Sequence, residues 1–308
     1  MFSIALNSII ILVICMILGF IARKRNLITK AGEPVLSSIL LSVTLPSTII
    51  MSMQRDFNRE LFNSSMIVLV ASFLIHFAGF FLGLLLFKVL RGKSYEKGVW
   101  VFSLVFSNLV YMGLPLIESI YGSMGVFYAS ICTISFNFLA FTLGVKIMIK
   151  GSNCSVEEKD TIKKIFFNVP IWATIIGFLM FTFSIRLPDV VGSALSSVGS
   201  MTTPLSMIII GSILATNNLK TVFLGAKMYI MIFVRLVAFP ILAFFVLRIF
   251  IADEVIVGVL TIATAMPAAV LTAIFAAKYE CNRDLASKFV FISTVLSVIT
   301  IPLIALLI

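Results

Sequence analysis

The stretch from Ser107 to Gly122 combines polar and helix-breaking residues inside an otherwise apolar segment. It contains Asn108, Gly113, Pro115 and Glu118. Proline lacks a backbone N–H and glycine has no side chain to restrain its backbone, so the pair predicts an interrupted helix. Interrupted backbone at membrane depth is stable only where protein or a water-filled cavity satisfies the freed polar groups. We therefore expect a binding site here.

A second interruption is predicted at Ala265–Ala269, around Pro267. The first helix is expected to unwind through Leu109–Leu114 and to restart after Pro115, and the second to restart after Pro267. In both, the second half-helix would point its N-terminus at the crossing. The free N–H groups and the positive dipole end favour an anion, by about 0.3–2 kcal/mol per helix end. Two such ends predict a site for a carboxylate or a similar group.

Several residues of these two stretches are therefore candidates for substrate binding. Asn108 could hydrogen-bond the substrate or cap its own half-helix, and Tyr111 could line the site or anchor the bundle. The candidates are Asn108, Tyr111, Gly113, Pro115, Met266, Pro267 and Ala268.

Three ionisable residues lie well inside apolar segments, where charge is costly and therefore suggests function. They are His76, Glu118 and Arg235. Arg235 could pair with Glu118 or attract an anionic substrate. Glu118 could couple transport to protons, or be an acid near the membrane surface. For His76 we expect a hydrogen-bonded histidine within the helix bundle.

The composition is that of a polytopic membrane protein. Of 308 residues, 61% are hydrophobic and 12% are charged, and apolar runs of about 20 residues recur along the chain. The net charge of +10 comes from cations in short loops, which indicates topology signals and no nucleic-acid partner. Four scattered cysteines and one histidine support neither a metal site nor an enzyme.

Hydropathy predicts ten transmembrane helices. The ranges are about 2–22, 33–53, 61–88, 97–121, 124–149, 164–184, 190–214, 220–250, 254–278 and 285–308. Of the 23 Lys and Arg residues, eighteen then flank the helices on one side and four on the other, and Arg235 lies within a helix. Because cytoplasmic loops are enriched in Lys and Arg, both termini are expected outside a plasma (inner) membrane.

The two halves of the chain resemble each other. At an offset of 158, Gly19 matches Gly177 and Pro46 matches Pro204, among seven identities between positions 19 and 50. Repeats of five helices each must insert in opposite senses, so we predict an inverted repeat with crossing broken helices 4 and 9, as in secondary transporters. The predicted parts are residues 1–149, a cytoplasmic connector at 150–163, and residues 164–308.

The run from Asn108 to Leu116, with Tyr121-Gly122 and Met266-Pro267-Ala268, resembles the auxin efflux carrier family, whose bacterial members are often labelled malonate-type transporters. The resemblance covers nearly the whole chain. It implies a fold related to bile-acid symporters and sodium/proton antiporters, with a scaffold and a transport subdomain. It also implies elevator-like movement of small organic anions and, by analogy with plant members, a homodimer. Asn108, Pro115 and Pro267 would be crossover residues near the substrate.

We therefore expect a secondary active or facilitative transporter of small carboxylates, malonate-like or auxin-like, embedded in the lipid bilayer. No cofactor is expected, and coupling to protons or sodium is left open. The alternative from another class is a membrane-embedded sensor or lipid-binding module that uses the same fold.

Overall fold

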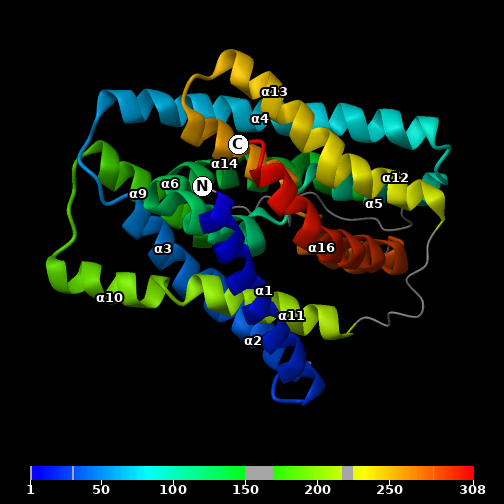
Figure 1. The fold of residues 1–308 in the computed structure, drawn as a ribbon, viewed down its shortest axis with the longest axis horizontal. Helices are drawn as coiled ribbons and strands as arrows, with labels where there is room; N and C mark the ends of the chain where they lie inside the picture. The colour runs from blue at the N-terminus through cyan, green and yellow to red at the C-terminus, as the bar shows by residue number, and fades with distance from the viewer. Residues whose placement is uncertain (1, 30, 150–168, 217–224, 280) are drawn as a thin grey trace. The chain divides into compact units, whose positions relative to one another are not determined.

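A computed structural model describes residues 2–29, 31–149, 169–216, 225–279 and 281–308. The predicted connector at 150–163 lies outside these ranges. Within them the chain is helical, and the only β-type pairing is an isolated antiparallel bridge between Ser107 and Ala268 (Figure 1).

Several helices of the described chain are joined end to end through short π-helical segments, named η. One 3-10 segment, η2, precedes α5. In chain order the elements are α1 (Phe2–Lys24), α2 (Gly32–Ile39), η1 (Leu40–Thr44), α3 (Leu45–Ser52), α4 (Arg59–Val89), η2 (Ser94–Glu96), α5 (Lys97–Val105), η3 (Leu109–Gly113), α6 (Leu114–Leu139), η4 (Ala140–Gly144), α7 (Val145–Ile149), α9 (Val169–Thr182), α10 (Asp189–Gly199), α11 (Thr202–Thr216), α12 (Ala226–Phe233), η6 (Val234–Ala238), α13 (Phe239–Phe250), α14 (Glu254–Ala265), α15 (Val270–Lys278) and α16 (Arg283–Ala305).

Six helical segments of the described chain are long and apolar enough to cross a membrane. They are Gly32–Ser52, Arg59–Val89, Leu109–Ile149, Asp189–Ile213, Ala226–Phe250 and Arg283–Ala305. Two shorter apolar helices, Val169–Thr182 and Glu254–Ala265, accompany them. The chain is therefore an all-helical, polytopic membrane protein.

The chain divides into two compact units, and neither unit follows one half of the sequence. Unit 1 contains Met1–Val68, Val110–Ile134 and Asn168–Asn217, and unit 2 contains Leu69–Leu109, Ser135–Phe167 and Asn218–Ile308. Each unit takes segments from both halves of the sequence.

Unit 1 is held together by helices whose backbones approach closely at glycines. Helix α1 packs along α11, and a Cβ added at Gly19 would lie 2.1 Å from the carbonyl oxygen of Ile208. Helix α9 packs on α3, and a Cβ added at Gly177 would lie 2.8 Å from the Met53 sulfur at the end of α3. Because side chains are missing at these points, the helices lie closer than larger residues would allow.

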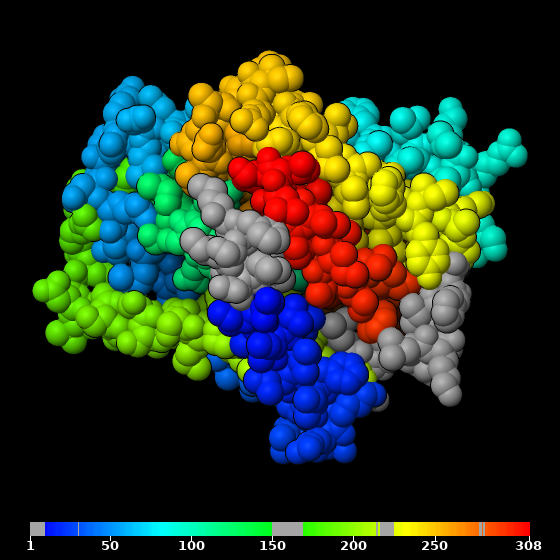
Figure 2. Space-filling model, viewed as in Figure 1, coloured from blue at the N-terminus to red at the C-terminus, as the bar shows by residue number. Residues whose placement is uncertain are grey.

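Unit 2 surrounds the predicted helix breaks. Helix α13 packs against α14, α15 packs against α16, and η6 contacts both α14 and α16. In the space-filling view, α16 (red) lies directly against α12 and α13 (yellow) (Figure 2). An aromatic cluster fills the interior beside α5, where the Phe102 and Phe106 rings lie 4.4 Å apart and Phe136 meets Phe106 edge-on.

The first helix breaks three residues earlier than predicted. Helix α5 ends at Val105, Phe106 is extended, and helical backbone resumes at Leu109 rather than after Pro115. Gly113 and Pro115 therefore lie inside helical turns. Proline is tolerated near a helix start, where N–H groups lack acceptors in any case, and the π-helical η3 precedes it. The second break matches the prediction, since α15 begins at Val270, shortly after Pro267.

Candidate functional site

The two broken helices are joined through their extended backbones in unit 2. The Asn108 N–H donates to the Pro267 carbonyl oxygen at 2.7 Å, and the Ala269 N–H donates to the Phe106 carbonyl oxygen at 2.9 Å. These bonds are related about the Ser107–Ala268 bridge. Each break therefore supplies hydrogen-bond partners to the other, which is how unwound backbone is stabilised away from water.

Helix α16 supports this crossover from one side. The Ala268 N–H donates to the Ser293 hydroxyl oxygen at 3.2 Å, and Ser293 is completely buried. Ser293 also donates to the Val290 carbonyl oxygen of its own helix. Sequence reasoning missed this residue because a serine in an apolar helix usually bonds only to its own preceding turn.

The start of α15 and the amide of Asn108 supply hydrogen-bond donors at the crossover. Val270 and Leu271 occupy the first turn of α15, where helix geometry leaves N–H groups without acceptors inside the helix. Asn108 is only 3% exposed, and its Nδ2 donates no hydrogen bond to any residue that the structure describes. A buried amide without a partner is costly, so the arrangement favours a ligand that accepts hydrogen bonds.

The backbone of Met266, Pro267 and Ala268 mainly builds the crossover. The Pro267 carbonyl and the Ala268 N–H are both used in the bonds above, and Met266 is fully buried. The N–H groups left at the helix start therefore lie three and four residues beyond the predicted Pro267 position. The start of α15 is marked by the N-cap conformation of Ala269. That conformation follows from the fold and not from the residue type, so the sequence did not reveal it.

Four predicted site residues, Tyr111, Gly113, Pro115 and Glu118, lie in unit 1. Glu118 Oε2 accepts a hydrogen bond from Thr203 Oγ1 at 3.1 Å. Arg235 belongs to unit 2, so its pairing with Glu118 stays a prediction.

His76 has the environment of a hydrogen-bonded histidine in the interior of unit 2. Its Nδ1 lies 2.7 Å from the Ser72 carbonyl oxygen, one turn back on α4. Its ring lies 5.8 Å from the Phe106 ring and meets Phe136 edge-on. The imidazole thus packs against the aromatic residue that directly precedes the crossover bridge.

Arg235 is the largest fully buried side chain of the described chain, with 1% of its surface exposed. It sits in the π-helical segment η6, between α12 and α13. Its Nε and Nη2 atoms have no hydrogen-bond partner among the described residues. The sequence had marked this position only because charge is rare within an apolar segment.

Comparison with known proteins places these features in a family. A family described as "Membrane transport protein" matches residues 4–305. The chain belongs to this family, which is the auxin efflux carrier family that its crossover residues resemble. It is a membrane transporter and not an enzyme.

Similar proteins carry transporter names and match over nearly their full lengths. An uncharacterized transporter of Methanocaldococcus jannaschii is 22% identical, covering 97% of each chain. One of Methanothermobacter thermautotrophicus is 24% identical, covering 96% of each. The uncharacterized transporter YfdV of Escherichia coli is 17% identical, covering 98% of this chain and 97% of its own.

Proposed function

We propose that this transporter carries small organic anions and holds the substrate's carboxylate at the crossover in unit 2. The observation that carries this proposal is the buried Asn108 amide, whose Nδ2 has no partner in the described chain. It stands next to the backbone that leads into α15, whose first N–H groups and positive dipole end also favour an anion. A carboxylate would accept hydrogen bonds from both.

We further propose that transport occurs by an elevator-type movement of unit 2 relative to unit 1. Two features support this mechanism. The chain separates into two compact units, and the crossover lies wholly within one of them. In addition, the backbone of unit 1 is tightly packed at Gly19 and Gly211, as expected of a scaffold that keeps its shape.

An inverted repeat of five helices per half is consistent with the packing inside each unit. In unit 1, Gly19 of α1 meets α11, and the matching Gly177 of α9 meets the end of α3. Pro46 of α3 and Pro204 of α11 are themselves matched in the sequence. In unit 2, the bonds of the crossover are symmetric about Ser107 and Ala268. The proposal includes a plasma-membrane location, outward termini and a homodimer, with proton or sodium coupling left open.

Uptake by purified protein in proteoliposomes tests the function. Labelled malonate, acetate and indole-3-acetate should enter liposomes that contain the protein, and imposed proton and sodium gradients will identify the coupling ion. Asn108→Ala should reduce uptake at least about tenfold, because a hydrogen bond to a charged group contributes about 1.5–3 kcal/mol. Asn63→Ala is the control, since Asn63 is exposed on α4 in unit 1.

Two results would contradict the proposal in different ways. Absence of transport for every carboxylate offered would argue against an organic-anion carrier. Normal uptake by a folded Asn108→Ala variant would remove Asn108 from the site while leaving the substrate class standing.

A further inference from the structure

Arg235 is a buried cation, and the described residues of unit 2 do not compensate its charge. The side chain is 1% exposed, and two of its three guanidinium nitrogens have no hydrogen-bond partner in the described chain. A buried charge is costly unless it is paired and hydrogen-bonded. Charged residues inside membrane segments usually face a partner, a cavity or a transported species.

The carboxylates that the structure describes in unit 2 do not lie in its interior. Glu96 directly precedes α5, Asp253 caps α14, Glu254 lies in its first turn, and Asp284 lies in the first turn of α16. Asp284 is also paired with Lys288 at 2.6 Å. Arg235 lies in the middle of the segment Ala226–Phe250. Its counter-charge therefore has no source in the described interior of unit 2.

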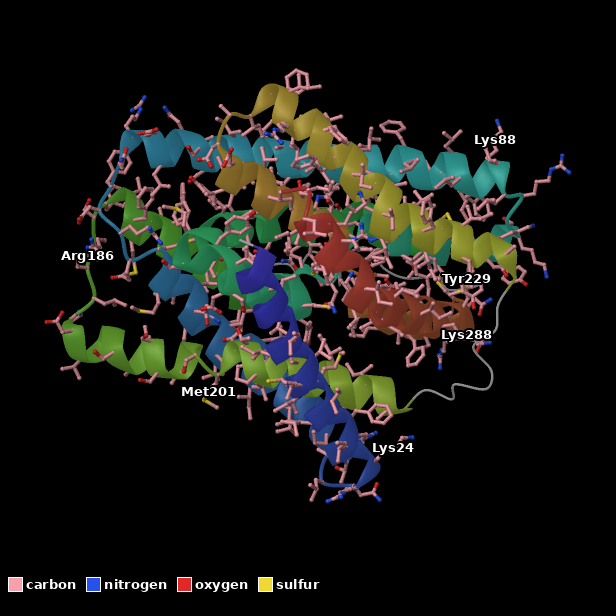
Figure 3. The ribbon with its side chains drawn as sticks, in the orientation of Figure 1. Lys24, Lys88, Arg186, Met201, Tyr229 and Lys288 are labelled. Carbon is pink, nitrogen blue, oxygen red and sulfur yellow. The ribbon has the colours of Figure 1, made fainter. Side chains whose placement is uncertain are left out.

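Arg235 lies at about the same depth as the serine that supports the crossover. The α12–α13 segment and α16 run side by side in the same direction (Figure 1). Tyr229 and Lys288 lie at the same end of these helices (Figure 3). Arg235 follows Tyr229 by six residues and Ser293 follows Lys288 by five. At ~1.5 Å per residue these offsets are about 9 and 7.5 Å, so Arg235 and Ser293 lie at similar distances along their helices from that end, and η6, which holds Arg235, contacts α16.

A second set of contacts links this part of α13 to the crossover. Phe239 follows Arg235 by one helical turn. A Cβ added at Gly79 would lie 3.5 Å from the Phe239 ring and 3.6 Å from the Val105 Cα atom. Phe239 and the end of α5, directly before Phe106 and the bridge, therefore flank the same residue of α4. Together with the contacts of η6 with α14 and α16, this places Arg235 near the helix that leads into the crossover and the helix that supports it.

We propose that Arg235 provides the fixed positive charge that binds and selects the anionic group of the substrate at the crossover. The inference rests on the proposed function and deepens it, since Asn108 and the start of α15 would recognise any hydrogen-bond acceptor. A guanidinium buried in a water-poor interior favours a full negative charge over a neutral group. The carrier therefore accepts carboxylates and rejects their uncharged amides.

Ligand-induced thermal stabilisation in nanodiscs tests this role. Malonate, acetate and indole-3-acetate are each compared with the corresponding amide, and at least one acid should raise the unfolding temperature of the wild-type protein while its amide does not. Arg235→Gln should weaken acid binding at least about tenfold, because hydrogen bonds between charged partners are the stronger kind. Arg248→Gln is the matched control, on the exposed end of the same helical segment.

The results separate the two proposals. If the wild-type protein binds no carboxylate, both fail. If it binds an acid and Arg235→Gln binds it equally well, only the role of Arg235 is overturned. If the Gln variant does not fold, Arg235→Met replaces it, because it also removes the charge and should weaken acid binding at least about tenfold. Unchanged acid binding by the folded Met variant would overturn the role.

A permanent ion pair with Glu118 is the competing explanation, and stability without ligand distinguishes it. If Arg235 awaits a substrate, Arg235→Met should unfold at or above the wild-type temperature, since an uncompensated buried charge has been removed. If Arg235 is paired with Glu118, the Arg235→Met and Glu118→Gln variants should each unfold at a lower temperature, and the double variant should recover part of the loss. The second pattern would overturn the proposal.

Discussion

Replacing Ser293 by alanine tests whether α16 positions the crossover. The substitution removes the hydroxyl oxygen that accepts the Ala268 N–H at 3.2 Å, where both residues are completely buried. An unpaired buried N–H costs about 1–3 kcal/mol. Because 3.2 Å is at the long end of the N–H···O range, we expect a loss of unfolding free energy in the lower part of this range, about 1–2 kcal/mol. The missing hydroxyl leaves little additional cavity.

Two measurements should register the loss. The unfolding temperature should fall by about 2–8 °C, since a loss of 1 kcal/mol shifts the unfolding temperature of a large domain by roughly 2–4 °C. Uptake in proteoliposomes should fall by about tenfold, because 1.4 kcal/mol corresponds to a factor of ten and the lost bond holds the residue before the N-cap of α15. The matched control is Thr294→Val, since Thr294 donates at 2.7 Å only to Val290 of its own helix.

The comparison within α16 gives the result that would refute this reasoning. Thr294→Val removes a hydroxyl that is buried as Ser293 is. The Val290 carbonyl loses that side-chain bond but still accepts the backbone hydrogen bond of its helix. If Ser293→Ala and Thr294→Val have the same unfolding temperature and the same uptake, the bond to Ala268 does not position the crossover. Loss of stability without loss of transport would restrict Ser293 to a structural role.

Two further predictions concern unit 1. Gly211→Ala should destabilise the protein by about 1–3 kcal/mol, because its Cβ would lie 1.8 Å from the Met16 carbonyl oxygen. Gly192→Ala is the control and should not destabilise the protein, because its Cβ would meet its neighbour only at an ordinary contact distance. Equal unfolding temperatures for the two variants would refute close packing of α1 on α11. Glu118→Gln keeps an acceptor for Thr203 but cannot carry a proton, so uptake should lose its dependence on a proton gradient while substrate exchange persists; a retained dependence would exclude Glu118 as the coupling acid.

Hydropathy correctly predicted an all-helical polytopic membrane protein, because the membrane imposes the length and composition of its helices, whereas the number of ten transmembrane helices stays a prediction. The described segments Arg59–Val89 and Ala226–Phe250, for example, lie close to the predicted ranges 61–88 and 220–250. An apolar span must satisfy its own backbone, so the helix is dictated by local composition. The positions of residues around the breaks depend on contacts between distant segments, and there the sequence was less informative.

The position of the first break illustrates this limit. Gly113 and Pro115 are strong helix breakers, yet the backbone is helical through both. The extended residues are Phe106, Ser107 and Asn108, of which none is a breaker by type. Their conformation is fixed by bonds to residues about 160 positions later in the chain. Local propensity is a weak prior when a tertiary partner satisfies the backbone.

The same distinction explains which residues of the proposed site the sequence could suggest. Asn108 and Arg235 were singled out because polar and charged side chains are expensive in an apolar segment. Ser293, Val270 and Leu271 were not, because a serine or an apolar residue in a membrane helix carries no such signal. Residues that act through their backbone, or by supporting another backbone, become visible only when the two breaks are brought together.

The distribution of satisfied and unsatisfied groups suggests how binding could drive the transport cycle. At the crossover the carbonyl groups of Phe106 and Pro267 and the N–H groups of Asn108 and Ala268 are all hydrogen-bonded within unit 2, so these bonds form without substrate. The unpartnered donors are side chains beside it, Asn108 Nδ2 and the guanidinium of Arg235. An anion that accepts hydrogen bonds from both Asn108 Nδ2 and the Arg235 guanidinium would neutralise the buried, uncompensated charge of unit 2. A charge neutralised in this way costs less to move through a low-dielectric environment than a free one. We therefore expect the loaded carrier to move more readily than the empty one, and an excess of unlabelled substrate on the far side to accelerate uptake.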